Sequence, residues 1–196
     1  THAAPLTFSN NFAVNAVKIH KAERSIDGTI KYSLQLHDKL LVEGVIIPSK
    51  NRLTACVSSQ VGCSLACKFC ATGTMKLDRN LSASEIYDQV FILNEEAISN
   101  FRKPLSNIVY MGMGEPLLNY KALLGSVKFI TTEQGLGMSP KRITVSTAGI
   151  AKMIMKLADD DVRFNLAISL HTASNSKRDL LMPLNQKIKL EELRES

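Results

Sequence analysis

Up to about residue 50, the chain alternates apolar and polar positions, a pattern of period two that is typical of half-buried β-strands. Three such runs are present: 16–24, 29–37 and 41–47. Asp27 and Gly28 separate the first two runs and supply the positive φ that a hairpin turn needs. Pro48 is expected to end the third run, because proline cannot donate to a sheet ladder. We expect a small antiparallel β lead-in over residues 16–50, preceded by an irregular leader or linker over residues 1–15.

From residue 51 onward, short apolar runs alternate with segments of helical period. The expected strands are 53–58, 108–111, 142–146 and 164–170, and the expected helices are 82–98, 120–132, 150–157 and 176–181. Ser82 and Glu85 have the spacing of a capping box at the start of the first helix. Its apolar face is expected at Ile86, Val90, Leu93 and Ala97. Strand-then-helix order predicts an α/β fold over residues 51–196, with parallel strands and right-handed crossovers.

The composition excludes several classes of protein. A length of 196 residues suits one ordinary domain or the core of a larger one. Hydrophobic residues make up 45% and charged residues 21%, which excludes a disordered or coiled-coil chain. No apolar run approaches the roughly 18 residues of a membrane span, and no secretory signal is visible, so we expect a cytoplasmic protein. The chain lacks a starting methionine and stops within an amphipathic pattern at 189–194, which predicts a piece of a longer protein.

The charge balance is moderately basic, with 24 lysines and arginines against 18 acidic residues and a formal net charge of +6. A positive field favours polyanions such as nucleic acid, although a solvated basic surface without a partner fits equally well. Aromatic residues are only 6% and tryptophan is absent, which argues against a base-stacking platform. Nucleic-acid binding would then depend on phosphate contacts, for which the candidates are Lys76, Arg79, Lys177 and Arg178.

The four cysteines all fall within 15 consecutive residues: Cys56, Cys63, Cys67 and Cys70. Disulfides that staple a fold are not clustered in this way, so metal binding or redox chemistry is favoured. The last three have the spacing C-x3-C-x2-C. Three thiolates on one loop can hold three irons of a [4Fe–4S] cluster, leaving the fourth iron open to a small chelating molecule. The alternative is a zinc site completed by Cys56 or His171.

Polar or cysteine-bearing segments follow each of the four predicted parallel strands. They are residues 63–70, 112–115, 146–147 and 169–171. Ligands of α/β folds collect at the carboxyl ends of the strands, so we expect one site built from all four segments.

The cysteine loop, with Phe69 directly before its third cysteine, resembles that of the radical S-adenosylmethionine (SAM) superfamily. Three segments are similar to the RlmN/Cfr group of RNA adenosine methyltransferases, most of all to its adenosine-C2 branch: 56–63, 111–119 and 168–171. The resemblance covers most of residues 40–190. It implies a partial parallel (β/α) barrel of six strands, four of them present here. It also implies methylation of C2 of an adenosine in 23S ribosomal RNA and transfer RNA, using a [4Fe–4S] cluster and two SAM molecules.

The same resemblance assigns roles to individual residues. The cluster ligands would be Cys63, Cys67 and Cys70, and the bound cluster would split SAM into a radical. The SAM contacts would be Gly114, Glu115, Ser146, Ser169, Leu170 and His171. The Glu115 carboxylate suits the SAM amine, and Gly112 and Gly114 would let the backbone approach the ligand closely.

Cys56 and Glu43 receive catalytic roles by this resemblance. Methyl transfer in the family runs through a methylated cysteine near the C-terminus, with which a thiol at Cys56 would form a disulfide to release the product. The plainer alternative for Cys56 is a buried core thiol. Glu43 would accept a proton, a task suited to a carboxylate between apolar neighbours, or would simply be an exposed strand glutamate.

The chain departs from the family because it has no cysteine outside residues 56–70, so the methyl-carrying cysteine is missing. We expect this piece to be inactive in methyl transfer and its last strand, 164–170, to form an exposed apolar edge. The implied partners are ribosomal and transfer RNA and an electron donor such as flavodoxin or ferredoxin. Two alternatives stay open: another radical SAM reaction, and a zinc-stabilised RNA-binding module without catalysis.

Overall fold

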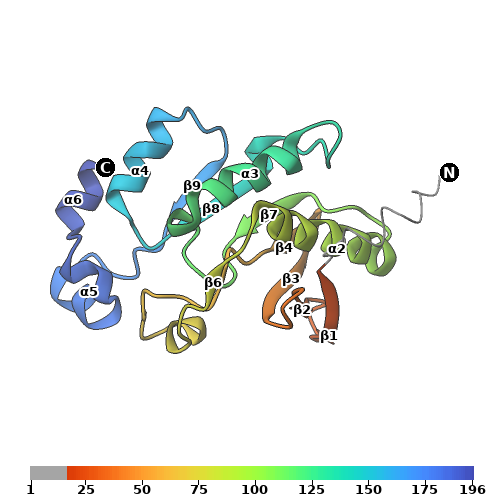
Figure 1. Cartoon of the computed structure of the whole chain (residues 1–196), viewed down its shortest axis with the longest axis horizontal. Coiled ribbons are helices and arrows are strands. Elements are labelled where there is room, and N and C mark those ends of the chain that lie inside the picture. The colour runs from red at the N-terminus through yellow and green to blue at the C-terminus, as the bar shows by residue number, and fades with distance from the viewer. Residues whose placement is uncertain (1–16) are drawn as a thin grey trace.

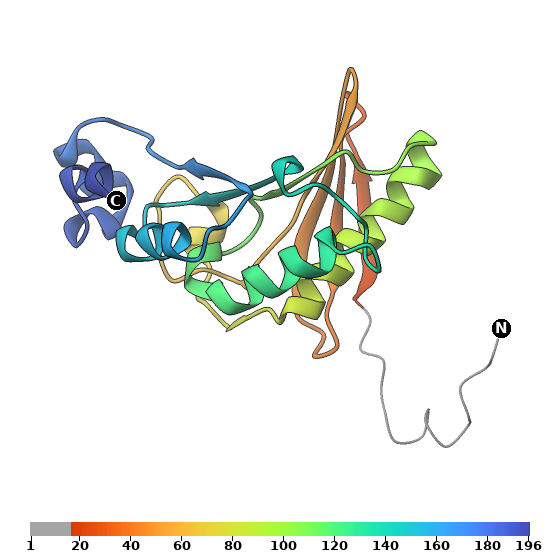
Figure 2. The ribbon, with the colours of Figure 1, turned by 90° about the horizontal axis from the view of Figure 1, so that it is seen from above.

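A computed structural model describes residues 17–196, in which seven strands form one mixed sheet (Figures 1 and 2). Their order across the sheet is β1-β2-β3-β4-β7-β8-β9. The strand bounds are β1 Lys18–Arg24, β2 Ile30–Gln35, β3 Leu41–Ser49, β4 Arg52–Cys56, β7 Asn107–Tyr110, β8 Ile143–Thr147 and β9 Asn165–Ile168. The leader or linker predicted for residues 1–15 lies outside the described residues.

Strands β1 to β4 are antiparallel neighbours, as predicted for the first three. Gly28, at φ +88°, lies in the hairpin turn between β1 and β2. The prediction that Pro48 ends the third strand is wrong, because β3 continues to Ser49 and Pro48 pairs with Leu53. Proline is tolerated near a strand end, where few ladder bonds remain to be lost. The pairing of β3 with β4 joins the antiparallel part to the parallel part in one continuous sheet.

Strands β4, β7, β8 and β9 are parallel, which confirms the predicted α/β arrangement. The helices α2 (Ala83–Phe101), α3 (Tyr120–Thr131) and α4 (Ala151–Asp159) lie in a row along one side of the sheet (Figure 1). Two short helices, α5 (Asn175–Leu181) and α6 (Leu190–Glu195), lie at the end of the molecule opposite β1. Smaller elements are the strand pair β5 (Gln60–Val61) and β6 (Arg79–Asn80) and four 3-10 turns: η1 Ala71–Thr74, η2 Pro116–Asn119, η3 Pro140–Arg142 and η4 Pro183–Gln186.

Helix α2 begins at the predicted capping box. The Glu85 N–H donates to Ser82 Oγ at 3.1 Å, and the Ser82 N–H donates to Glu85 Oε2 at 2.9 Å. The four residues of the predicted apolar face are fully buried: Ile86, Val90, Leu93 and Ala97. This helix packs on β3, β4 and α3 and so fixes the strands that lead into the cysteine loop.

The carboxyl ends of the parallel strands lie at one edge of the sheet. The cysteine loop follows β4 by way of β5, and the segments after β7, β8 and β9 reach the same edge. None of the helices between residues 17 and 196 combines the length and hydropathy that crossing a bilayer requires.

Candidate active site

A cavity of about 310 Å³ opens at the carboxyl ends of the parallel strands. Its lining includes cysteines, glycines, hydroxyls and a carboxylate from all four strand-end segments: Cys63, Cys67, Cys70, Gly112, Gly114, Glu115, Ser146, Thr147, Ser169 and His171. Leu170 is the only predicted SAM contact that does not line this cavity, and its side chain is 43% exposed.

The loop between β5 and η1 carries three free, partly buried thiols: Cys63, Cys67 and Cys70. The Cys70 N–H donates to the Cys67 carbonyl at 3.2 Å, and the Lys68 N–H donates to the Leu181 carbonyl of α5 at 2.9 Å. Burial raises the pKa of the Cys63 thiol, and it raises the pKa of Cys67 to about 11. Metal binding must therefore displace protons from this loop.

These thiols form a donor set of the kind that binds an iron–sulfur cluster. Within residues 17–196, no three His, Cys, Asp or Glu side chains converge closely enough to hold one metal ion. A structural zinc ion needs four donors around itself, whereas each thiolate of a [4Fe–4S] cluster binds its own iron. His171, the alternative zinc ligand, lies against Phe69, with ring centroids 3.8 Å apart and ring planes tilted by 38°. The thiol-only donor set on one cavity wall therefore fits a cluster with one open iron.

Glu115 is a buried carboxylate, 3% exposed, that lines the same cavity. Its Oε1 accepts from the Leu117 N–H at 3.0 Å and its Oε2 from the Ala148 N–H at 2.7 Å. Burial raises the pKa of Glu115, although these bonds oppose the shift. No cationic side chain in the described part of the chain forms an ion pair with it. A buried carboxylate without a counter-charge favours a cationic ligand, such as an ammonium group.

The two glycines of the loop after β7 are required by the protein's own packing. A Cβ on Gly112 would lie 2.7 Å from Ser58 Oγ, and one on Gly114, at φ +93°, would lie 2.5 Å from Gln60 Cβ. The prediction named close approach of the ligand as the reason for these glycines. The structure shows close approach of the segment that follows β4, and the close approach of a ligand stays a prediction.

The ends of β8 and β9 are joined by the hydroxyls of Ser146 and Ser169, whose Oγ atoms lie 3.1 Å apart. His171 has a φ of +58°, and its ring lies against the partly exposed ring of Phe69. The cysteine loop and the segment after β9 therefore meet at one wall of the cavity.

Cys56 and Glu43 lie near each other but outside the cavity lining. Burial raises the pKa of Cys56 to about 11, and the nearby charge of Glu43 contributes to the rise. Cys56 is therefore a protonated thiol at neutral pH. The side chain of Glu43 is 49% exposed and forms an ion pair with Lys31, so the apolar surroundings expected around this carboxylate are absent.

Comparison with known proteins decides the family. The family model described as the radical SAM superfamily matches residues 57–196, well over half of the chain. The chain belongs to the radical SAM superfamily. A solved radical SAM methyltransferase from Sphaerobacter thermophilus matches with a TM-score of 0.91 and 37% identity, covering 97% of this chain and 57% of that chain. This match confirms the predicted partial barrel of radical SAM type.

Curated relatives extend the similarity to the RlmN branch. The probable dual-specificity RNA methyltransferase RlmN of Christiangramia forsetii is 56% identical over 187 residues, covering 95% of this chain and 53% of the relative. The dual-specificity RNA methyltransferase RlmN of Anaeromyxobacter sp. is 45% identical over 178 residues, covering 89% and 47%. This radical SAM chain therefore spans about half the length of the curated relatives it matches.

The disulfide predicted for Cys56 is not found. All four cysteines of this radical SAM chain are free. By the resemblance, the disulfide partner of Cys56 was a second cysteine near the C-terminus of the family's proteins. The chain contains no such residue.

Sequence reasoning missed the buried amides that hold the strand-end loops together. Gln60 Oε1 accepts from the Glu115 N–H at 2.8 Å, and Gln60 Nε2 donates to Asn80 at 2.7 Å. Asn119 Nδ2 donates to the carbonyls of Ser59 and Leu81. Buried amides are almost always bonded in this way, but an isolated Gln or Asn in a sequence predicts a surface position as readily.

Two of the four predicted phosphate contacts are engaged elsewhere. Arg79 forms ion pairs with Glu85 at 2.8 Å and with Asp38 at 2.7 Å. Arg178 is fully buried. Those two predictions are wrong, because both guanidinium groups are bound within the protein.

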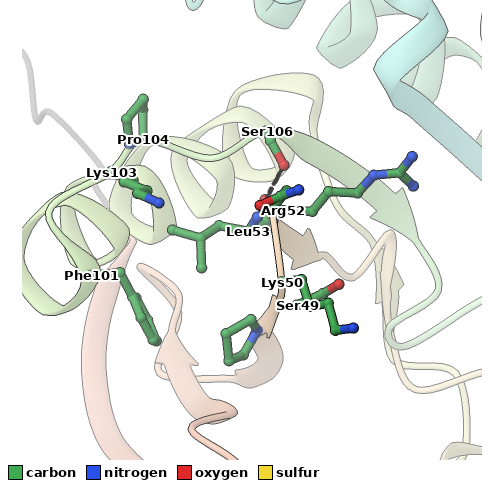
Figure 3. A pocket seen from close by; sticks show the side chains of 10 residues that line it. Ser49, Lys50, Arg52, Leu53, Phe101, Lys103, Pro104 and Ser106 are labelled. Carbon is green, nitrogen blue, oxygen red and sulfur yellow. Dashed lines mark hydrogen bonds between the residues drawn. The ribbon is translucent and has the colours of Figure 1, made fainter.

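A second cavity, of about 190 Å³, lies at the amino ends of β4 and β7, the sheet edge opposite the cysteines (Figure 3). The apolar part of its lining is formed by Pro48, Leu53, Phe101 and Pro104. The same lining carries three exposed cations: Lys50, Arg52 and Lys103. Among residues 17–196, none of these three cations forms an ion pair. This basic hollow therefore has positive charge available for an anion.

Proposed function

We propose that this chain is the cluster-bearing part of a radical SAM enzyme that methylates C2 of an adenosine in 23S ribosomal RNA and transfer RNA through a methylated cysteine. One observation carries the proposal: a single cavity contains three free thiols and a buried carboxylate without a counter-charge. The names of the curated relatives support an RNA substrate. Another radical SAM reaction could use the same cavity, but the resemblance of residues 111–119 favours methyl transfer to RNA.

The proposed cluster ligands are Cys63, Cys67 and Cys70. When bound, the cluster supplies the electron that cleaves SAM. Glu115 would accept hydrogen bonds from the SAM ammonium, because its carboxylate has lone pairs beyond those used by Leu117 and Ala148. The further proposed SAM contacts are Gly114, Ser146, Ser169, Leu170 and His171.

Glu43 is proposed to accept the proton that the methylated adenine carbon loses. Its exposed carboxylate at the start of β3 lies near Cys56, which is kept as a candidate catalytic thiol. The four cysteines of the chain leave none for the methyl-carrying role, so we propose that the 196-residue chain alone does not methylate RNA. We also propose that residues 16–50 form a β lead-in to a cluster-binding unit at 51–196.

The test is anaerobic reconstitution with iron and sulfide, followed by dithionite, or flavodoxin with its reductase, and SAM. The expected result is a brown protein that releases 5′-deoxyadenosine. A Cys70→Ala variant should lose this activity, whereas Ser64→Ala, on the exposed part of the same loop, should keep it. A colourless protein with one tightly bound zinc ion, or full activity in Cys70→Ala, would overturn the proposal.

For the RNA partner, the basic hollow is the proposed phosphate contact. Replacing Lys50, Arg52 and Lys103 with Gln should weaken RNA binding and flatten the plot of log affinity against log salt by about 0.7–0.9 per lost contact. The matched control carries Gln at three exposed lysines elsewhere: Lys128, Lys141 and Lys152. Equal salt slopes for both triple variants would rule out the hollow as the contact.

A further inference from the structure

A fully buried cation lies behind the wall of the cavity that contains the three thiols. Arg178, in α5, has 0% exposure. Its Nε donates to the Leu170 carbonyl at 3.3 Å and its Nη2 to the Ala148 carbonyl at 2.6 Å. Its Nη1 donates to Asn185 Oδ1 at 2.9 Å. The guanidinium therefore ties together the segments that follow β8 and β9.

All three acceptors are neutral. Over residues 17–196, Arg178 forms no ion pair, and the neighbouring Asp179 is bound to Lys189 and Asn185 instead. A buried charge without a counter-charge is strongly unfavourable. Neutral donors could tie the same loops together, so these hydrogen bonds alone do not explain a positive charge at this position.

The cysteine loop would become a source of negative charge when its thiols lose their protons to bind a cluster. The Lys68 N–H bond to Leu181, at 2.9 Å, packs this loop against the helix that carries Arg178. Cys67 and Ala148 line the same cavity, and the Ala148 carbonyl accepts from Arg178 Nη2. The Ala148 N–H donates to Glu115, the proposed contact for the SAM ammonium. Ala148 therefore connects Arg178 to this carboxylate as well.

We propose that Arg178 is the fixed counter-charge of the cluster held by Cys63, Cys67 and Cys70, and that it makes this cluster easier to reduce. The inference rests on the proposed function, because three thiolates give the bound cluster a negative charge that grows when an electron is added. A cation held nearby in the protein interior stabilises the reduced form more than the oxidised form. Arg178 acts through its electric field and does not line the cavity, so it is a positioning residue.

The experiment measures the reduction potential of the reconstituted chain by anaerobic spectroelectrochemistry, with iron content determined in parallel. Arg178→Gln removes the charge but keeps amide donors, and Arg178→Lys keeps the charge but loses the forked geometry. At a fixed potential, the reduced-to-oxidised ratio should fall at least about tenfold in Arg178→Gln, equivalent to about 59 mV for one electron. It should stay within about threefold of wild type in Arg178→Lys and in Lys177→Gln, the exposed cation on the same helix.

The possible results distinguish an effect of the Arg178 charge from a purely structural role of this side chain. Failure of Arg178→Gln to bind iron while Arg178→Lys binds it would also support the counter-charge. Equal potentials in wild type and Arg178→Gln would overturn this inference and leave the proposed function intact. Loss of the cluster from both variants would assign Arg178 a structural role and overturn the inference. A wild-type chain that assembles no cluster would overturn both proposals.

Discussion

Two buried side chains of opposite charge, Glu115 and Arg178, stand at the candidate site without counter-charges among residues 17–196. A domain that only had to fold would gain little from either group, since buried charges are costly unless they are paired. A cationic ligand would compensate Glu115, and an anionic cluster would compensate Arg178. At the residue scale, these two groups fit the chemistry that the cysteine spacing predicted.

The Glu115 carboxylate can be tested by Glu115→Gln. The variant should bind SAM at least about tenfold more weakly in the reconstituted chain, roughly 1.4 kcal/mol, because the charge opposite the ammonium is lost. It should also lose about 1–3 kcal/mol of stability, because an amide cannot accept from both backbone N–H groups. Calorimetric titration and thermal unfolding measure the two effects, with exposed Glu133→Gln as the control. Unchanged SAM affinity would contradict the assignment.

The Cys56 thiol provides a pH-dependent prediction. Because its pKa is raised to about 11, the folded chain at pH 8 should contain roughly a hundredfold less Cys56 thiolate than an exposed cysteine would. Alkylation by iodoacetamide, followed by mass spectrometry, should therefore be slow at pH 8 and accelerate as the pH approaches 11. The urea-unfolded chain serves as the reference. Equal rates in folded and unfolded chains at pH 8 would show that this thiol is not protected.

At the scale of elements, local sequence signals placed most helices and strands. The capping box at Ser82 and Glu85 marked the start of α2, and the spacing of its apolar residues identified the buried face. The continuation of β3 past Pro48 and the β5–β6 pair were missed. Both features depend on pairing with a second segment. The periodicity of one segment does not reveal such pairing.

The capping box itself supports a stability prediction. Ser82→Ala removes the acceptor of the Glu85 N–H and should cost about 1 kcal/mol, lowering the melting temperature by about 2–4 °C. Ser99→Ala, at an exposed position of the same helix, should be neutral or slightly stabilising, because alanine is the better helix former. Circular dichroism melts of the two variants and wild type measure the difference. Equal melting temperatures for all three proteins would contradict the assigned role of the cap.

At the scale of the whole molecule, the parallel topology places most of the predicted site residues around one cavity. Segments distant along the chain meet at one cavity because their strands end at the same sheet edge. The alternation of strands and helices was enough to anticipate this meeting. The burial of Arg178 and the ion pairs of Arg79 were not predictable, since both depend on side-chain contacts between elements.

The outer strand β9 exposes apolar side chains at the edge of the sheet, as the sequence predicted. Leu166 and Ile168 are each 39% exposed. We expect the isolated chain to self-associate through this edge as its concentration rises, and the double substitution of these residues by Lys should reduce the association. Sedimentation velocity across a concentration series measures it. A wild-type chain that stays monomeric throughout would contradict the prediction.

A three-cysteine cluster with one open iron is tested most directly by electron paramagnetic resonance of the anaerobically reconstituted, dithionite-reduced chain, recorded with and without SAM and combined with iron analysis. We expect about four irons per chain and a [4Fe–4S] signal that changes when SAM binds the open iron. Binding of a single zinc ion, or a cluster signal that SAM leaves unchanged, would contradict this expectation.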